Sequence, residues 1–90
     1  MSEPYRLNIT RTARRALSER LLVEAAGAVI EFLRGPLSEN PYRVGAPLNA
    51  PFEGQYRARR GEYRVRYRID DRERMVHVLN VSHRRIAYRT

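Results

Sequence analysis

The side chains best suited to acid–base chemistry lie at the C-terminal end of the 90-residue sequence, where residues 82–90 read SHRRIAYRT. His83 has an ordinary pKa of about 6.5, within the physiological range, and Tyr88 can donate a proton where neighbouring cations lower its pKa. Arg84 and Arg85 stay protonated, so they bind and stabilise negative charge but do not transfer protons. The segment is either a solvated basic tail or the proton-transferring half of an active site.

The segment YRARRGEYRVRY, residues 56–67, predicts a basic β-hairpin. A two-residue loop that begins with glycine, as Gly61-Glu62 does, fits a type II′ turn. Such a loop pairs Arg60 with Tyr63, Arg59 with Arg64, Ala58 with Val65, Arg57 with Arg66 and Tyr56 with Tyr67. Because side chains alternate between the two faces of a strand, one face then carries Arg57, Arg59, Arg64 and Arg66.

No carboxylate is interleaved with these four arginines. Like charges opposite each other on paired strands cost about 0.2–1 kcal/mol, so a hairpin shaped for stability alone would alternate their sign. The pattern is typical of a phosphate-binding surface, and Arg60 and Arg85 are further candidates for contacts with RNA. The alternative is a solvated sheet face whose arginine stems cover apolar surface, and Arg66 and Arg68 fit that alternative best.

The overall charge points to an anionic partner. The formal net charge is +8 and all 18 basic residues are arginine, whose planar guanidinium suits phosphate. Nucleic acid is the leading candidate, an acidic protein the second and a membrane surface the third. Cysteine is absent, and we find no metal-ligand cluster and no glycine-rich phosphate loop, so we expect no metal and no cofactor. His77, between two valines, is interpreted as a core or sheet-face histidine.

An arginine face beside one histidine and one tyrosine suits metal-independent cleavage of RNA. The 2′-hydroxyl of the substrate attacks the adjacent phosphate, one group accepts its proton and another protonates the leaving 5′-oxygen. Arginine stabilises the charge that develops on the phosphate.

Alternating and helical patterns place these residues on a small α+β fold. Residues 5–10 alternate as a half-buried strand, and residues 11–35 repeat apolar positions at helical spacing, as one bent helix or a helical hairpin with Ser18 as a possible cap. Gly35-Pro36 predicts the end of the helix, and residues 36–54 are expected to form a long connection. Three strands follow, at residues 56–60, 63–69 and 75–82.

The expected architecture is an N-terminal strand, one or two helices and a three-stranded antiparallel meander, with the helices on one face of a four-stranded sheet. The length predicts a single domain over residues 1–90. No stretch reaches the roughly 18 to 20 apolar residues of a membrane span, and the first ten residues lack a signal-peptide core, so we expect a cytoplasmic protein without membrane contact.

Several motifs together resemble the RelE-type toxins of type II toxin–antitoxin systems. They are FLRGPL, NPYRVGAPL, ARRGEYRVRYRIDD and the terminal VSHRRIAYR, and with the order of elements they cover essentially the whole chain. The resemblance implies a RelE-like fold and a ribosome-dependent mRNA endonuclease that cuts mRNA in the ribosomal A site and inhibits translation. It also implies a RelB-like antitoxin partner in a hetero-oligomeric complex.

The resemblance assigns roles to individual residues. The basic pair of the second family strand falls on Arg57 and Arg59, the arginine of the GEYR element is Arg64, and the catalytic residues near the C-terminus fall on His83, Arg84 and Tyr88. The best-known RelE pattern has lysines on the second strand, one of them proposed as the base. Arginine stands there in this chain, which moves the general-base role to His83, with Tyr88 and Arg84 as acid and charge stabiliser.

Two alternatives to the nuclease follow from the same sequence. The ParE branch of the superfamily shares the fold and poisons DNA gyrase without cleaving RNA, but it generally lacks the His/Arg/Tyr tail. A toxin homologue without activity, or a plain nucleic-acid-binding module, is the third interpretation.

Overall fold

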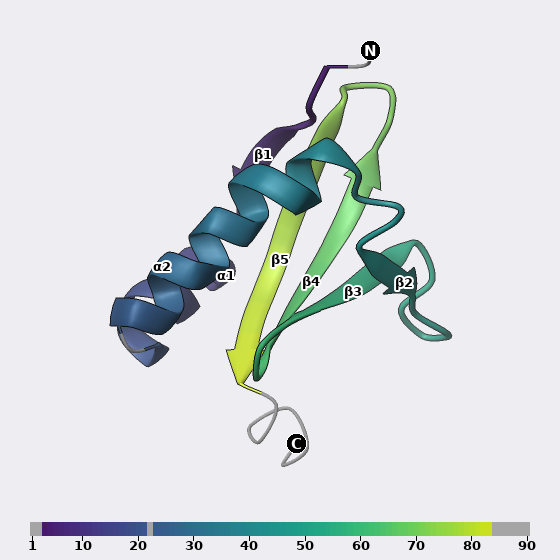
Figure 1. The fold of residues 1–90 in the computed structure, drawn as a ribbon. Helices are drawn as coiled ribbons and strands as arrows, with labels where there is room; N and C mark the ends of the chain where they lie inside the picture. Colours follow the sequence, from purple (N-terminus) through teal and green to yellow (C-terminus); the bar gives the residue numbers. More distant parts are fainter. Residues whose placement is uncertain (1–2, 22, 84–90) are drawn as a thin grey trace.

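The computed structural model describes residues 3–21 and 23–83, and Figure 1 shows how their helices and strands are arranged. Within these residues a mixed sheet consists of β1 (Arg6–Ile9), β2 (Gly45–Pro47), β3 (Gln55–Arg60), β4 (Tyr63–Asp70) and β5 (Met75–His83). Their spatial order is β1-β5-β4-β3-β2, and β1 is parallel to β5 while the other neighbours are antiparallel. The α+β class and the C-terminal meander are confirmed. The sheet has five strands within the described residues instead of the four expected, because β2 forms inside the long connection.

Two helical segments precede the meander. The first is α1 (Arg11–Arg15), which continues as the π-helical segment η1 (Ala16–Arg20), and the second is α2 (Val23–Phe32), which continues as η2 (Leu33–Leu37). Leu21, with φ −107° and ψ 148°, is extended and separates the two, so the helical hairpin is the correct alternative. The prediction that Ser18 caps the second segment is wrong, because Ser18 lies inside η1 and its hydroxyl bonds the carbonyl of Arg15. The side chain that caps α1 is Thr10, which accepts a hydrogen bond from the Ala13 N–H.

The prediction that the helix stops at Gly35-Pro36 is also wrong. Both residues lie within η2, and the helical backbone continues through Ser38. A proline inside an α-helix clashes with the carbonyl four residues earlier, whereas a π-helical turn is wider and bonds five residues apart. Gly35 does not have the positive φ of a helix-terminating glycine. The wider turn therefore accommodates Pro36 and brings Leu37 into the core, where it is fully buried.

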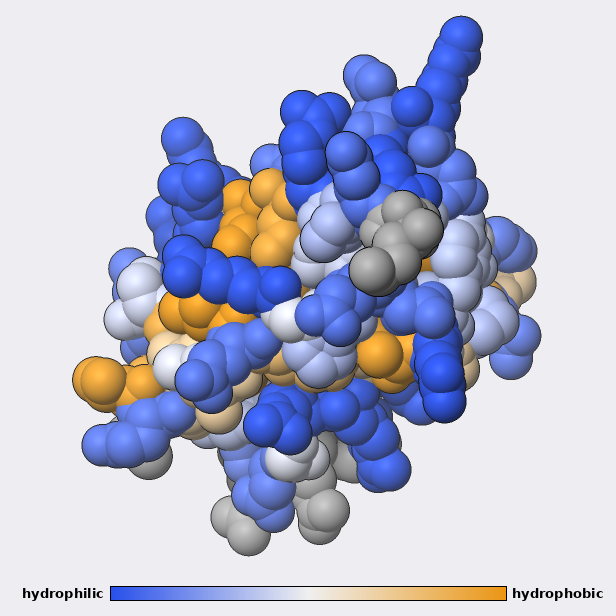
Figure 2. All heavy atoms as spheres, turned by 45° about the horizontal axis from the view of Figure 1, so that its top comes forward, coloured by the Kyte–Doolittle hydropathy of each residue, from blue (hydrophilic) through white to orange (hydrophobic). Residues whose placement is uncertain are grey.

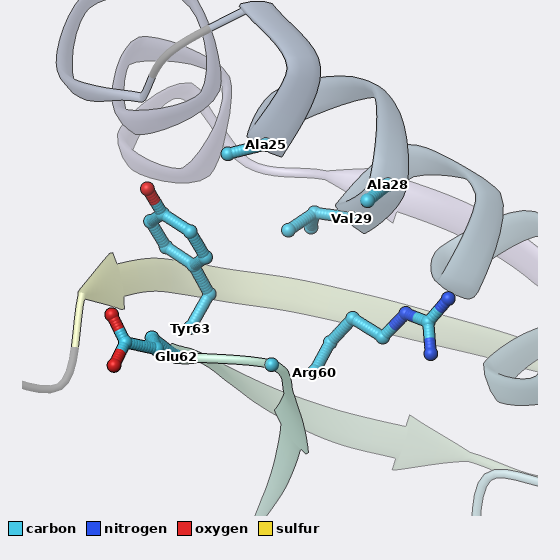
Figure 3. A pocket seen from close by; sticks show the side chains of 7 residues that line it. Ala25, Ala28, Val29, Arg60, Glu62 and Tyr63 are labelled. Carbon is cyan, nitrogen blue, oxygen red and sulfur yellow. The ribbon is translucent and has the colours of Figure 1, made fainter.

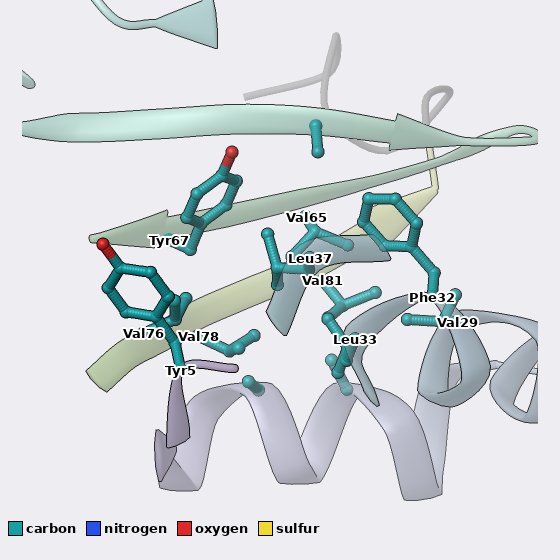
Figure 4. Close-up of a cluster of buried hydrophobic side chains, with 13 residues drawn as sticks. Tyr5, Val29, Phe32, Leu33, Leu37, Val65, Tyr67, Val76, Val78 and Val81 are labelled. Atoms are coloured by element: carbon teal, nitrogen blue, oxygen red, sulfur yellow. The ribbon is translucent and has the colours of Figure 1, made fainter. Parts of the chain in front are cut away.

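The core lies between the helices and one face of the sheet (Figure 4). The sheet contributes alternate residues of its strands, and the helices contribute their apolar positions: Ala13, Ala16, Val29, Phe32, Leu33, Leu37, Ala58, Val65, Tyr67, Val76, Val78 and Val81. Leu7 and Ile9 of β1 pack against this cluster, as their alternation predicts. The hydroxyl of Tyr67 donates a 2.6 Å hydrogen bond to the Pro41 carbonyl, and burial raises the pKa of Tyr67, so the hydroxyl stays protonated. Fully burying such side chains contributes about 1.5–3 kcal/mol each, which makes this cluster the main source of stability.

The edge strand β2 lies close against the core. It pairs with β3, with Gly45 opposite Ala58 and Ala46 opposite Arg57. A Cβ atom at Gly45 would lie 2.8 Å from the Arg57 carbonyl oxygen and would collide with the Tyr67 hydroxyl. Only glycine fits this position without displacing its neighbours.

A cluster around Asp71 joins three distant segments at the opposite end of the sheet from the β3–β4 turn. The hydroxyls of Tyr5 and Tyr42 both donate to the Asp71 carboxylate. The Arg74 guanidinium lies over the Tyr5 ring, 4.3 Å from its centroid. The hydrogen bonds from Tyr42 and Tyr5 lower the pKa of Asp71, and the same carboxylate raises the pKa of Tyr42 to about 12. The cluster thus links the start of β1, the loop before β2 and the β4–β5 turn.

In the part of the chain that the structure describes, none of the helices combines the length and the apolar character needed to cross a membrane.

Candidate nucleic-acid interface

The predicted basic hairpin is present, with the predicted register. Gly61 and Glu62 form its two-residue turn, and all five predicted cross-strand pairs between β3 and β4 are found. Gly61 has φ +61°, whereas Glu62 does not have a positive φ, as a type II′ turn requires. Local turn chemistry therefore sets the pairing of every arginine on this hairpin.

The arginines share the face of the sheet that points away from the helices. Ala58, Val65 and Tyr67 are buried against the helices, so their neighbours along the strands point to the opposite side. We call this surface the arginine face, and it comprises Arg57, Arg59, Arg64, Arg66 and Arg68. Arg57 lies opposite Arg66, Arg59 opposite Arg64, and Arg68 opposite Gln55.

Strand β5 extends this face with polar side chains. Asn80 is the partner of Arg66, Ser82 of Arg64, and His77 of Arg68. His77 Nδ1 is 2.9 Å from the Asn8 amide nitrogen, which confirms the interpretation of His77 as a satisfied sheet-face histidine. The face is therefore polar across three neighbouring strands, and its charged side chains on β3 and β4 are the five arginines and, at the far end of β4, Asp70.

Exposure divides the arginines into two groups. Arg57, Arg59 and Arg68 are exposed, whereas Arg64 and Arg66 are half-buried. The Arg66 guanidinium lies over the ring of Phe52, 5.4 Å from its centroid. Among the described residues, Arg66 Nε and Gln55 Oε1 are buried and have no hydrogen-bond partner. Buried polar atoms without partners are uncommon, so Arg66 and Gln55 are held here at a cost in folding free energy.

His83 lies on the other face of the sheet. It is the cross-strand partner of Tyr63, and the two rings pack edge-to-face with centroids 5.2 Å apart. Its Nε2 is 3.2 Å from a carboxylate oxygen of Glu62. The β3–β4 turn and the first residue of β4 therefore orient the imidazole.

A β-bulge explains why His83 is not on the arginine face. His77 and His83 are six residues apart, so an unbroken strand would point both to the same side. Tyr67 pairs with Val78 and Arg66 with Asn80, which leaves Leu79 as an extra residue and reverses the alternation. The Thr10 hydroxyl lies 2.9 Å from the Val78 carbonyl oxygen and 3.2 Å from that of Leu79, so the cap of α1 also contacts the bulge.

Arg60 also points to the helix side. It pairs with Tyr63 and lines a pocket of about 310 Å³ between α2 and the β3–β4 turn, with Ala25, Ala28 and Val29 of α2 on the opposite wall (Figure 3). Arg60 is therefore separated from the arginine face. The remaining predicted residues, Arg84, Arg85 and Tyr88, lie outside the described residues.

Sequence reasoning did not identify Glu62, Gln55 or Phe52. A signal for Glu62 was available in the sequence, because it is the carboxylate in the predicted β3–β4 turn, next to the strand that pairs with the end of β5. Phe52 lies in the long connection, where no strand periodicity indicates the direction of a side chain. Within residues 3–21 and 23–83, no group of three or more His, Asp or Glu side chains is arranged to hold a metal ion.

The fold assigns the chain to a class of small toxins. It superimposes on the toxin–antitoxin complex RelBE2 from Mycobacterium tuberculosis with a TM-score of 0.88 and 46% identity, covering 93% of this chain and 95% of that one. An archaeal RelE–RelB complex from Pyrococcus horikoshii shares the fold, with a TM-score of 0.71 at 24% identity, covering 98% of this chain and 100% of that one.

The sequence comparison agrees with the fold. The family model for the ParE toxin of the type II toxin–antitoxin system parDE matches residues 8–88. Two Mycobacterium tuberculosis relatives are similar over 86 residues: Toxin RelE is 46% identical, covering 96% of this chain and 88% of the relative, and Toxin RelG is 48% identical, covering 96% and 98%. The chain belongs to the RelE/ParE family of type II toxins, as its motifs indicate.

Proposed function

We propose that this toxin is a ribosome-dependent endoribonuclease that cleaves mRNA in the ribosomal A site and so inhibits translation in the cytoplasm. The observation that carries the proposal is the pair of cross-strand arginine contacts, Arg57 with Arg66 and Arg59 with Arg64, on a sheet face not covered by the helices. Such a face costs folding energy through repulsion between its cations, so it fits an anionic ligand better than a purely structural role.

The arginine face binds and stabilises charge, and the end of β5 transfers protons. Arg59 and Arg64 contact the scissile phosphate and stabilise the charge that develops on its oxygens, while Arg57 and Arg66 hold neighbouring phosphates. The 2′-oxygen attacks the adjacent phosphorus, a 2′,3′-cyclic phosphate forms and the bond to the 5′-oxygen breaks. We assign acceptance of the 2′-proton to His83, which directly follows Ser82, the cross-strand partner of Arg64, but points to the helix side, so the RNA passes around this end of the sheet to reach both groups.

His83 is held as a general base needs to be held. The Glu62 carboxylate at 3.2 Å from Nε2 and the edge contact with Tyr63 restrict its ring orientation. Tyr88 as the acid and Arg84 as a further charge stabiliser complete the proposed site, with Arg60 and Arg85 as additional contacts to RNA.

The proposal includes a partner. The two solved structures compared above are complexes of toxins with antitoxins, and we propose that a RelB-like antitoxin binds this toxin in a hetero-oligomer. A net charge of +8 favours acidic segments in that antitoxin.

A gyrase inhibitor is the second candidate, because the matching family model describes a ParE toxin. The same fold serves both activities, so the site has to distinguish them. The ordered His83–Glu62–Tyr63 contacts favour the nuclease, since an inhibitor that only binds protein has no need of an oriented histidine.

One experiment separates the two. The toxin is induced in cells, and mRNA 5′ ends are mapped for the wild type, His83→Ala, Tyr88→Phe and the control His77→Ala. We expect codon-phased cleavage that falls about 100- to 10,000-fold in His83→Ala, the range for loss of a general base, and persists in His77→Ala. Supercoiling defects without mRNA cleavage would instead identify a gyrase inhibitor. Cleavage that persists in both His83→Ala and Tyr88→Phe would show that these residues are not the catalytic ones.

A further inference from the structure

Hydrophilic side chains cover most of the molecular face in Figure 2, and apolar ones reach the surface between them. In the described part of the chain, the large apolar side chains with the greatest exposure are Val23 at 84%, Tyr42 at 47% and Phe52 at 42%. Tyr42 is explained by its bond to Asp71 and its edge contact with Tyr56. Phe52 differs from the other two because its ring lies against a cation of the arginine face, Arg66.

The backbone around Phe52 is held in a fixed conformation. Its N–H donates to the Asn49 carbonyl at 2.9 Å, and its own carbonyl accepts from the Gln55 N–H at 3.0 Å. The Leu48 N–H donates to the Gln55 carbonyl at 2.9 Å and closes the loop between β2 and β3. Consecutive bonded turns position the ring before any ligand arrives, which lowers the entropic cost of binding to it.

The surroundings of Phe52 are incomplete in a way that suits a nucleotide. One guanidinium covers one side of the ring, and the 42% exposure leaves the rest accessible to a planar group. Arg66 Nε and Gln55 Oε1 are buried without hydrogen-bond partners in the described residues, one a donor and the other an acceptor. A nucleotide offers an aromatic plane, phosphate acceptors and base-edge donors together, whereas an acidic peptide offers acceptors without an obligatory plane.

We propose that Phe52 is a stacking platform for a base of single-stranded RNA whose phosphates lie along the arginine face. The inference rests on the proposed RNA-binding function and adds a residue to it. Phe52 takes one base, Arg57 and Arg66 bind the flanking phosphates, and Gln55 contacts a polar edge. Phe52 is a binding residue and takes no part in the chemical step.

The chain contains no tryptophan, so Phe52→Trp introduces a single fluorescent reporter at the proposed platform. Val23→Trp is the matched control, because Val23 is exposed on α2, on the helix side of the sheet. Each variant is titrated at low salt with a fluorescein-labelled 2′-O-methyl RNA oligonucleotide, which cannot be cleaved because the attacking hydroxyl is blocked. Anisotropy of the label reports binding, and tryptophan emission in the same sample reports stacking.

We expect RNA to quench the tryptophan emission of Phe52→Trp, with the same midpoint concentration as the anisotropy curve. The emission of Val23→Trp should stay unchanged. Inorganic polyphosphate, which has charge but no bases, should bind to both variants and quench the tryptophan emission of neither. In the otherwise native chain, Phe52→Leu should weaken RNA binding about 5- to 100-fold and polyphosphate binding hardly at all, while Phe52→Tyr retains affinity.

Two outcomes overturn the inference in distinguishable ways. RNA binding without quenching of Phe52→Trp would show that no base stacks on residue 52, while RNA binding by the arginine face would still be supported. A face that binds polyglutamate but not RNA removes both this inference and the proposed function, and assigns the arginine face to an acidic protein.

Discussion

The His83 imidazole packs edge-on against the ring of Tyr63, its direct cross-strand partner, with the two ring planes at 85°. Tyr63 begins β4 immediately after the turn that carries Glu62, and Glu62 reaches His83 Nε2. Two adjacent residues therefore fix the orientation of the one histidine at the end of β5. If His83 is the base, Tyr63 and Glu62 act as its positioning residues.

Tyr63→Ala tests this relationship. Without the ring, His83 can turn away from the substrate, and we expect cleavage to fall about 10- to 100-fold, since a misplacement of 1 Å can have this effect. Tyr63→Phe keeps the ring and should retain activity. In a His83→Ala background, Tyr63→Ala should cause no further loss in a single-turnover cleavage assay. Equal losses in both backgrounds would show that Tyr63 acts independently of His83.

Arg59→Ala should weaken RNA binding and make it less sensitive to salt. Each lost contact between an arginine and a phosphate of a single strand should lower the slope of log affinity against log salt by about 0.7. Arg34→Ala, on the exposed side of η2, removes the same charge far from the face and serves as the control. The measurement is RNA affinity across a salt series, and an unchanged slope in Arg59→Ala would mean that this residue does not touch RNA.

Arg57→Glu should stabilise the protein while reducing its affinity for RNA. Arg57 faces Arg66 across the β3–β4 ladder, so the substitution replaces repulsion with attraction. We expect the free energy of unfolding to rise by a few tenths to about 1 kcal/mol, measured by urea titration. Arg57→Gln removes the charge without reversing it, so its free energy of unfolding should lie between those of the wild type and Arg57→Glu. A loss of stability in Arg57→Glu would contradict the view that the face carries electrostatic strain for binding.

Gly45→Ala and Gly27→Ala should have opposite effects on stability. An added methyl at Gly45 meets the Tyr67 hydroxyl and the Arg57 carbonyl, and such overpacking costs about 1–3 kcal/mol. At Gly27 in α2 nothing lies within 4 Å of an added Cβ, and alanine in a helix gains about 0.5–1 kcal/mol over glycine. Thermal unfolding of the two variants provides the comparison, and a Gly45→Ala protein as stable as the wild type would show that β2 adjusts freely.

The Asp71 cluster should make stability depend on pH in the acid range. Hydrogen bonds from Tyr42 and Tyr5 lower the pKa of Asp71 below its ordinary 3.8 in the folded protein. The resulting stabilisation is present above 3.8 and is lost as the pH falls through the lower folded-state value. Asp71→Asn should therefore be less stable than the wild type at pH 7, and the difference should shrink as the pH drops below 3.8. Urea titrations at pH 7 and pH 3 measure this difference in the free energy of unfolding. A difference that is the same at both pH values would show that ionisation of Asp71 does not cause it.

The sequence by itself determined the hairpin and its arginine face. Gly61-Glu62 selects a two-residue turn, that turn fixes the pairing of Arg59 with Arg64, and the period of two in a strand assigns the faces. Each step depends on neighbours along the chain, so local rules are sufficient. The apolar positions of residues 11–35 repeat at helical spacing, and two of them, Ala13 and Phe32, are buried as that spacing predicts.

Only the tertiary structure decided which way His83 points. The alternation of β5 reverses at Leu79, where the strand contacts Thr10, a residue almost seventy positions earlier in the chain. A bulge forms where two segments distant in sequence must both be satisfied, and no local pattern encodes that fit. The same reason applies to η2, where Pro36 is accommodated inside a π-helical turn, and to β2, whose place beside β3 depends on Gly45 against Tyr67. Local chemistry thus set the charge of the surface, and long-range packing set the direction of the side chain proposed to transfer the proton.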